Sequence, residues 1–281
     1  MSRIRVVTDS SSGITEDTAQ ELGITVVPIQ VQFGSDSFKE GIDLTIDEFY
    51  RRLDEPVIPT TSQPSPGDFV NAYRTLANDP DCDEILSLHL TSKGSGTCQA
   101  ARLAAQMIDG PRISVIDTET ASLGTGLITL AAAEAVRNGA SLDQVVELIR
   151  RGMTSTFVYV ALPSLKYVRR CGRVPQVQAW VASLLSISPV LSMKDGLVEA
   201  IERVRTFKSA VRRTAELAEQ ACGGHARRLA VLHTNAYNEA CGLLKDMKTR
   251  VTADMTYICD MRGSMAVHGG AGMLGVAVSG V

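Results

Sequence analysis

The sequence has no pair of cysteines at the spacing of a zinc or redox site. Its six cysteines stand alone, at positions 82, 98, 171, 222, 241 and 259, and none has a partner at the C-x-x-C spacing. The four histidines likewise never occur at the i, i+4 spacing of a helical metal site. We therefore expect no metal ion and no cofactor, and we expect free thiols in a cytoplasmic protein.

The sequence also has no large excess of positive or negative charge and no long apolar run. The 28 Lys and Arg residues nearly balance 31 Asp and Glu residues, which leaves a formal net charge of -3. Such a chain has no large positive field to attract nucleic acid. The first residues contain no apolar stretch of signal-peptide length, and no window approaches the ~20 apolar residues that span a bilayer. We expect no nucleic-acid partner and no integral membrane segment, and at most a transient contact with a membrane.

Motifs for catalysis are missing as well. The loop Gly94-Ser95-Gly96 does not have the G-x-S-x-G spacing of a nucleophile elbow, and no G-x-x-x-x-G-K-[ST] phosphate loop occurs. We therefore predict that the chain contains no catalytic residues of its own.

Short strands alternate with helices through the first half of the sequence. Capping signals at Thr15, Thr45, Ser65 and Ser141 each mark a helix start. Between them lie β-rich runs at residues 5–8, 24–33, 84–90 and 112–117. This alternation predicts βαβ units, and hence a parallel sheet with helices on both faces.

The pattern changes after about residue 153. Two β-capable runs, 186–193 and 197–204, are joined through Lys194-Asp195-Gly196, which is a strong hairpin signal. The length of 281 residues also suggests about two domains. We predict an α/β protein with a parallel-sheet α/β/α domain at 1–153 and an α+β domain with antiparallel pairing at 154–281.

Four loops rich in hydroxyl groups follow the strands of the first domain. They lie at residues 8–12, 60–63, 91–97 and 117–122. Ligands of open α/β sheets bind at the carboxyl ends of the strands, where helix N-termini present free N–H groups. Serine and threonine are also the commonest helix caps, so each loop alone has a purely structural explanation. Together the loops indicate a small anion, and Ser95, between two glycines, is the strongest candidate ligand.

Two further segments allow two interpretations each. His268 precedes Gly269-Gly270-Ala271-Gly272, which either brings backbone and imidazole close to a ligand or forms a plain turn. The basic run from Arg169 to Arg173 is either an anion clamp or a solvated turn.

The order of these motifs resembles the DegV family, which includes the fatty-acid-binding subunits of bacterial fatty acid kinase. Six segments carry the resemblance, namely Val7-Thr8-Asp9-Ser10, Thr61-Ser62-Gln63-Pro64-Ser65, Ser92-Lys93-Gly94-Ser95-Gly96-Thr97, Cys171-Gly172-Arg173, Val204-Arg205 with Lys208, and His268 to Gly275. Each segment alone is a weak signal, whereas six segments in the order found in the family form a specific pattern.

The resemblance implies that one long-chain fatty acid lies between the two domains. It assigns the carboxylate to Thr61 and Ser95 and places His268 near the same head group. Ser62, Gly96 and Thr97 belong to the same two motifs and complete the expected ligand-binding set. Arg173 and Arg205 are expected to support acyl phosphate formation by a separate kinase.

Two alternatives stay open from the residues alone. A serine acyl hydrolase would use Ser95 as nucleophile and His268 as base. A binding module would hold another small carboxylate at the same loops.

Overall fold

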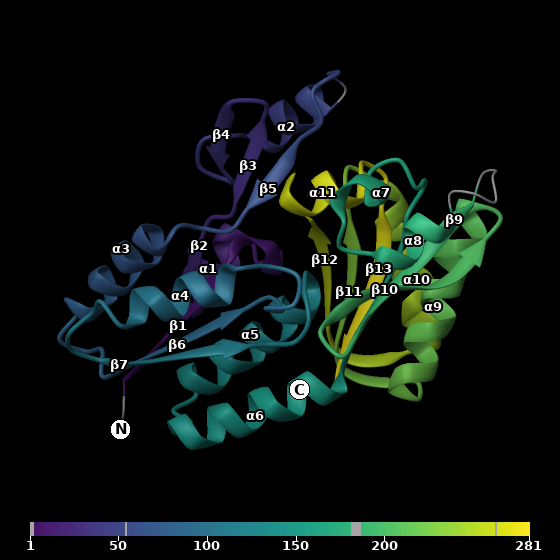
Figure 1. The fold of residues 1–281 in the computed structure, drawn as a ribbon. Helices are drawn as coiled ribbons and strands as arrows, with labels where there is room; N and C mark the ends of the chain where they lie inside the picture. The colour runs from purple at the N-terminus through teal and green to yellow at the C-terminus, as the bar shows by residue number, and fades with distance from the viewer. Residues whose placement is uncertain (1–2, 54, 181–186, 262) are drawn as a thin grey trace.

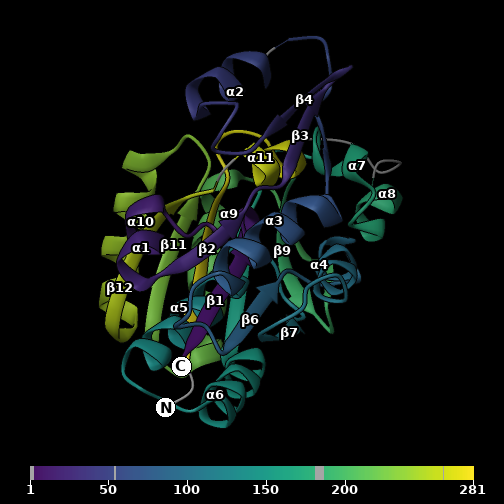
Figure 2. The ribbon, with the colours of Figure 1, turned by 90° about the vertical axis from the view of Figure 1, so that its left-hand side faces the viewer.

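The computed structural model describes residues 3–53, 55–180, 187–261 and 263–281. Within these residues the chain forms two large sheets and one small sheet, and the small sheet projects from one end of the molecule (Figures 1 and 2). No helix of the described residues has the length and apolar character that crossing a membrane requires.

The first large sheet is entirely parallel, as the sequence predicts. Its order is β2-β1-β6-β7, with bounds Ile24–Val27, Ile4–Asp9, Glu84–His89 and Arg112–Asp117. One face packs on α3 (Pro66–Ala77) and α4 (Thr97–Ala105), and the other on α1 (Glu16–Leu22) and α5 (Leu123–Arg137). The predicted α/β/α arrangement is therefore confirmed.

The predicted single strand over residues 24–33 is wrong. β2 ends at Val27, and β3 (Gln30–Phe33) belongs to the small antiparallel sheet with β4 (Asp36–Lys39) and β5 (Thr60–Ser62). Pro28 lies at the break, and it has no N–H group to continue the hydrogen-bonded ladder. The chain thus changes sheets here, and α2 (Ile46–Leu53) then packs on the small sheet through Phe49 and Leu53.

The second large sheet is mixed and mostly antiparallel. Its order is β10-β9-β8-β13-β11-β12, with bounds Leu197–Val204, Ser188–Lys194, Thr156–Ala161, Leu274–Ser279, His225–His233 and Thr252–Asp260. Only β11 and β12 pair in parallel. Helices α9 (Phe207–Cys222) and α10 (Tyr237–Arg250) cover one face, which gives the α+β unit that the sequence predicts.

The predicted hairpin between β9 and β10 forms. Asp195 and Gly196 have φ angles of 50° and 75°, as a tight two-residue hairpin turn requires. The predicted start of the first hairpin strand, Ser186, lies outside the described residues.

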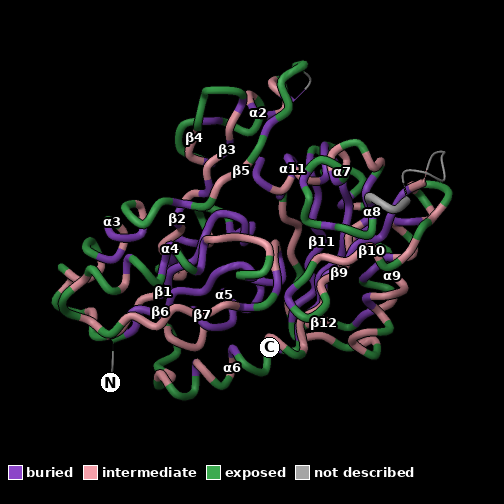
Figure 3. The backbone as a smooth tube through the Cα atoms, in the orientation of Figure 1, coloured by how far each residue is buried: buried purple, intermediate pink, exposed green. Residues whose placement is uncertain are grey.

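Helix α5 packs against both large sheets. Leu127 and Ile128 of this helix share one hydrophobic core with Leu88 of the parallel sheet and with Val158 and Leu232 of the mixed sheet. Figure 3 shows buried residues concentrated along α5 and the central strands. Helix α6 (Leu142–Ser155) ends where β8 begins. One hydrophobic core thus extends across both large sheets. The division into two domains at residue 153 stays a prediction.

Candidate functional site

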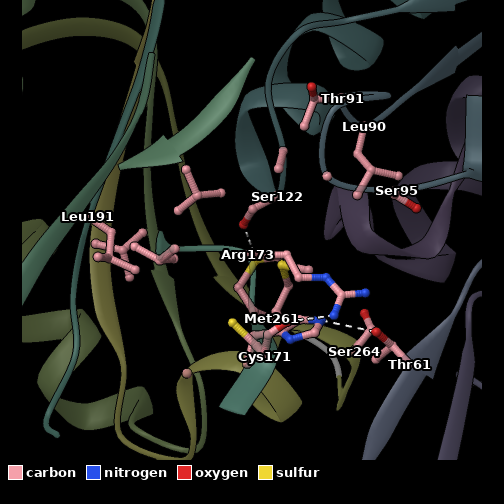
Figure 4. A pocket seen from close by; sticks show the side chains of 18 of the residues that line it. Thr61, Leu90, Thr91, Ser95, Ser122, Cys171, Arg173, Leu191, Met261 and Ser264 are labelled. Atoms are coloured by element: carbon pink, nitrogen blue, oxygen red, sulfur yellow. Dashed lines mark hydrogen bonds between the residues drawn. The ribbon is translucent and has the colours of Figure 1, made fainter. Parts of the chain in front are cut away.

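A cavity of 370 Å³ lies between the two large units. Strands β8, β9 and β10 contribute an apolar wall, which includes Val158, Val160, Leu191 and Val198. The loops after β6 and β7 and the end of β5 supply hydroxyl groups, and α11 (Gly263–Gly269) supplies a histidine (Figure 4). An apolar body with polar groups gathered at one end suits an amphipathic ligand.

Thr61 and His268 meet at the polar end of this cavity. Thr61 lies on β5, where it pairs with Val31 of β3. His268 lies near the end of α11, a short helix that the sequence does not reveal. The Thr61 hydroxyl is 3.1 Å from Nε2 of His268. Two motifs that are remote in sequence therefore form one contact in the cavity wall.

His268 is held in its neutral form. Burial and the positive charge of Arg173 lower the pKa of His268 to about 4. Its Nδ1 atom is buried and has no hydrogen-bond partner among the described residues. A buried nitrogen without a partner costs free energy, so a water molecule that reaches Nδ1 would be stabilised there.

The loop before α4 contributes Ser95 to the cavity lining but not the next hydroxyl residue, Thr97. Ser95 Oγ lies 2.8 Å from Thr97 Oγ1 and accepts a hydrogen bond from the Thr97 N–H. Ser95 and Gly96 line the cavity, whereas Thr97 is fully buried behind them. A Cβ on Gly96 would lie 2.9 Å from the Gln63 side chain. Glycine at this position therefore lets the Ser95 loop approach the segment that carries Thr61 and Ser62.

Arg173 reaches the same end of the cavity. It follows Gly172, whose φ of 67° ends the short helix α7 (Val168–Cys171). Its guanidinium donates to the carbonyl oxygen of Cys171 at 2.6 Å and points toward Thr61 and Ser264 in Figure 4. Arg205, in contrast, is exposed after β10 and does not line the cavity. Of the eight residues expected to act, the cavity brings six together and leaves out Thr97 and Arg205.

Glu40 anchors helix α11 and has no motif in the sequence. Its buried carboxylate accepts hydrogen bonds from the Ser264 N–H at 2.6 Å, from the Ser264 hydroxyl at 3.0 Å and from the Ser10 hydroxyl. Ser264 also lines the cavity. A lone glutamate before a glycine gives no hint of this role, because its partners lie far away in the sequence.

The β9–β10 hairpin is bound to the loop that precedes Ser95. Thr91 Oγ1 donates to the carbonyl oxygen of Gly196 at 2.7 Å, and Lys93 Nζ donates to that of Asp195 at 2.6 Å. The loop and the hairpin both line the cavity as well, the loop through Thr91 and the hairpin through Met193. The two units are thus joined across the cavity by hydrogen bonds as well as by the shared core.

Ser95 and His268, the nucleophile and base of the alternative hydrolase, each have another hydrogen-bond partner in this structure. Ser95 Oγ pairs with Thr97, and His268 Nε2 pairs with Thr61. A Ser–His hydrolase needs these two side chains within hydrogen-bonding reach of each other. Among the described residues, no group of three His, Cys, Asp or Glu side chains has the geometry of a metal site.

Comparison with known proteins places this chain in a family. A family model described as "Uncharacterised protein, DegV family" matches residues 3–280. The chain belongs to the DegV family. A DegV domain-containing protein of Streptomyces coelicolor is 34% identical, and the match covers 99% of each chain. Protein DegV of Bacillus subtilis is 32% identical over 97% of this chain and 98% of its own.

Two solved DegV structures share the fold throughout. A DegV family protein from Thermus thermophilus, described as fatty acid binding, superimposes with a TM-score of 0.90 at 33% identity and covers 99% of this chain and 100% of its own. DegV of Bacillus subtilis, described as a fatty acid binding protein, has a TM-score of 0.88 at 30% identity over 100% of both chains. Fatty acid binding is therefore found in relatives that share the whole fold.

Proposed function

We propose that this protein binds one long-chain fatty acid in the cavity, with its carboxylate between Thr61, Ser95 and Arg173. The observation that carries the proposal is the cavity itself, which is apolar along the strands and polar at one end. Burial is worth roughly 0.8 kcal/mol per methylene, so a tail of about fourteen methylenes contributes on the order of 11 kcal/mol before the costs of ordering. The tail then supplies affinity, and the polar end supplies orientation.

The head-group residues suit an anion in particular. Arg173 brings a positive charge, and the hydroxyls of Thr61, Ser62 and Ser95 supply neutral donors. If His268 carries its proton on Nε2, the imidazole donates to the Thr61 oxygen, and the threonine proton is then available to the ligand. Two DegV relatives at 30% identity or more are described as fatty acid binding, which supports the same assignment.

Native mass spectrometry of the purified protein tests this proposal. We expect a mass increment that matches one fatty acid, and extraction of the lipid identifies it. A chain that stays empty after incubation with long-chain fatty acids, yet takes up a short carboxylate, would favour the alternative of a small-carboxylate module.

A finer proposal is that the protein presents the bound acid to a separate fatty acid kinase. Arg173 lines the cavity and has a planar guanidinium whose five N–H donors suit phosphate. We propose that it stabilises negative charge while the partner phosphorylates the carboxylate. The protein alone should form no product from acyl esters, or from ATP and fatty acid. The cytoplasmic location stays a prediction.

An assay with a purified fatty acid kinase tests the role of Arg173. Arg173→Ala, at matched lipid loading, should fail to support phosphorylation, whereas Arg170→Ala, an exposed neighbour, should behave as wild type. Normal phosphorylation of the fatty acid bound to Arg173→Ala would show that Arg173 has no role in the transfer. Arg205→Ala, assayed in the same way, tests the role of the second, exposed arginine.

A further inference from the structure

Four of the nine methionines in the chain line this one cavity. Met261, Met265 and Met273 come from α11 and the residues on either side of it, and Met193 comes from β9. The cavity lining therefore contains two kinds of apolar side chain, the branched valines and leucines of the strands and the unbranched thioethers of the four methionines.

The branched strand side chains have little freedom to change shape. Val158 and Val160 lie on β8, which pairs with β13 on one side and β9 on the other. A β-branched side chain has one flexible torsion and few allowed rotamers, and the hydrogen-bonded ladder fixes its backbone. Acyl chains that differ in shape must therefore be accommodated by other side chains of the cavity lining.

The methionine side chains have this freedom, but the four differ. Met261 is 1% exposed and accepts a hydrogen bond at its sulfur from Ser122 at 3.5 Å. Met273 is 5% exposed and lies so close over Gly269 that a Cβ there would overlap its sulfur. These two side chains are held in place.

Met193 and Met265 are only partly buried. Met265 packs against both the core around α5 and the apolar cluster around α7, so it lies where the two meet. An unbranched side chain with three rotatable bonds and a polarisable sulfur adapts to irregular partners.

We propose that Met193 and Met265 set the range of acyl chains that this cavity accepts. The two side chains change rotamer so that straight saturated, cis-unsaturated and methyl-branched chains of equal carbon number all fit, while the strand side chains stay fixed. This inference rests on the proposed function, since it concerns which fatty acids occupy the same cavity.

Affinities of delipidated protein for three sixteen-carbon acids test the proposal. The probes are palmitic acid, its cis-monounsaturated analogue and an iso-branched isomer. For wild type we expect dissociation constants within about tenfold of one another, a spread of about 1.4 kcal/mol. In the double variant Met193→Ile and Met265→Ile, each isoleucine keeps the number of side-chain heavy atoms but is branched at Cβ and stiff at χ1. The spread should widen beyond tenfold, whereas Met107→Ile, at an exposed position, should leave it unchanged.

Several outcomes would overturn the proposal. One is a wild-type protein that separates the three acids by more than a hundredfold, and another is a folded double variant with the wild-type spread. Crystal structures of wild type with the straight and the cis-unsaturated acid give a test that needs no variant. We expect different Met193 or Met265 rotamers in the two complexes, and identical rotamers would count against the proposal. If wild type binds none of the three acids, the proposed function itself fails, which is a distinct result.

Discussion

The Thr61 hydroxyl lies 3.1 Å from Nε2 of His268, although 207 positions separate the two residues in the sequence. One belongs to the small projecting sheet and the other to a short helix before the last strand. The contact lies in the lining of the cavity, so the proposed head-group site depends on how these two segments are held together.

Removal of the Thr61 hydroxyl should weaken fatty acid binding. Thr61→Val keeps the shape of the side chain but removes a hydrogen bond to a charged group, which costs about 1.5 to 3 kcal/mol. We expect dissociation constants roughly tenfold to hundredfold higher in calorimetric titration. Thr61→Ser should restore most of the affinity, and Thr60→Val, at an exposed position beside it, should have no effect. Unchanged binding by Thr61→Val would contradict the head-group assignment.

His268 should make the stability of the protein depend on pH. Its pKa is about 4 in the folded protein, below the ordinary value of 6.5 that applies to the unfolded chain. Between these two pH values His268 is protonated in the unfolded chain but not in the folded protein. The free energy of unfolding therefore decreases as the pH falls from about 6.5 towards 4. Between about pH 7.5 and about pH 5 the loss should be about 2 kcal/mol.

Urea unfolding at these two pH values measures the effect. His268→Asn should lack this part of the pH dependence, and His225→Asn, at an exposed position, should retain it. An identical pH dependence in wild type and His268→Asn would show that the histidine titrates normally in the folded protein.

Loss of the Glu40 carboxylate should destabilise the protein and loosen helix α11. Glu40→Ala leaves the buried N–H of Ser264 without its acceptor, and two hydroxyls lose theirs. We expect a loss of about 3 kcal/mol in the free energy of unfolding by urea, together with weaker fatty acid binding, since Ser264 and His268 are on this helix. Glu55→Ala, which removes an exposed ion pair with Arg51, should cost under about 1 kcal/mol. Equal effects of the two variants would rule out the anchoring role.

The hydrogen bonds between Thr91, Lys93 and the β9–β10 turn should slow the exchange of fatty acid. The double variant Thr91→Val and Lys93→Met removes both hydrogen bonds to the hairpin, each worth about 0.5 to 1.5 kcal/mol. If the hairpin separates from the loop when the ligand leaves, release should be at least about fivefold faster in stopped-flow displacement of a fluorescent fatty acid. Lys194→Met, at an exposed lysine that ends β9 beside the same turn, is the matched control. A release rate equal to wild type would indicate another exit.

Local signals in the sequence predicted the elements that begin with a strong cap or end in a tight turn. Ser65 and Ser141 form the predicted capping boxes, and Asp195-Gly196 forms the predicted turn. Each of these depends on residues within three positions of one another, so no knowledge of the tertiary structure is needed.

Helix α11 could not be predicted in the same way. Its seven residues have glycine at both ends, and they are too few to show a helical period. The carboxylate that holds it, Glu40, lies 224 positions from Ser264. The motifs contain six residues that line the cavity, but only the fold shows that Thr61 contacts His268 and that Thr97 is not part of the cavity lining.

The core shared through α5 has a consequence for folding. Leu127 and Ile128 would lose partners on one side if either large sheet unfolded alone. Neither half of the chain can then keep its apolar face covered without the other, so unfolding should occur as one cooperative transition. A ligand in the cavity between the two sheets would raise the melting temperature of the entire protein, because it binds only when both halves are folded.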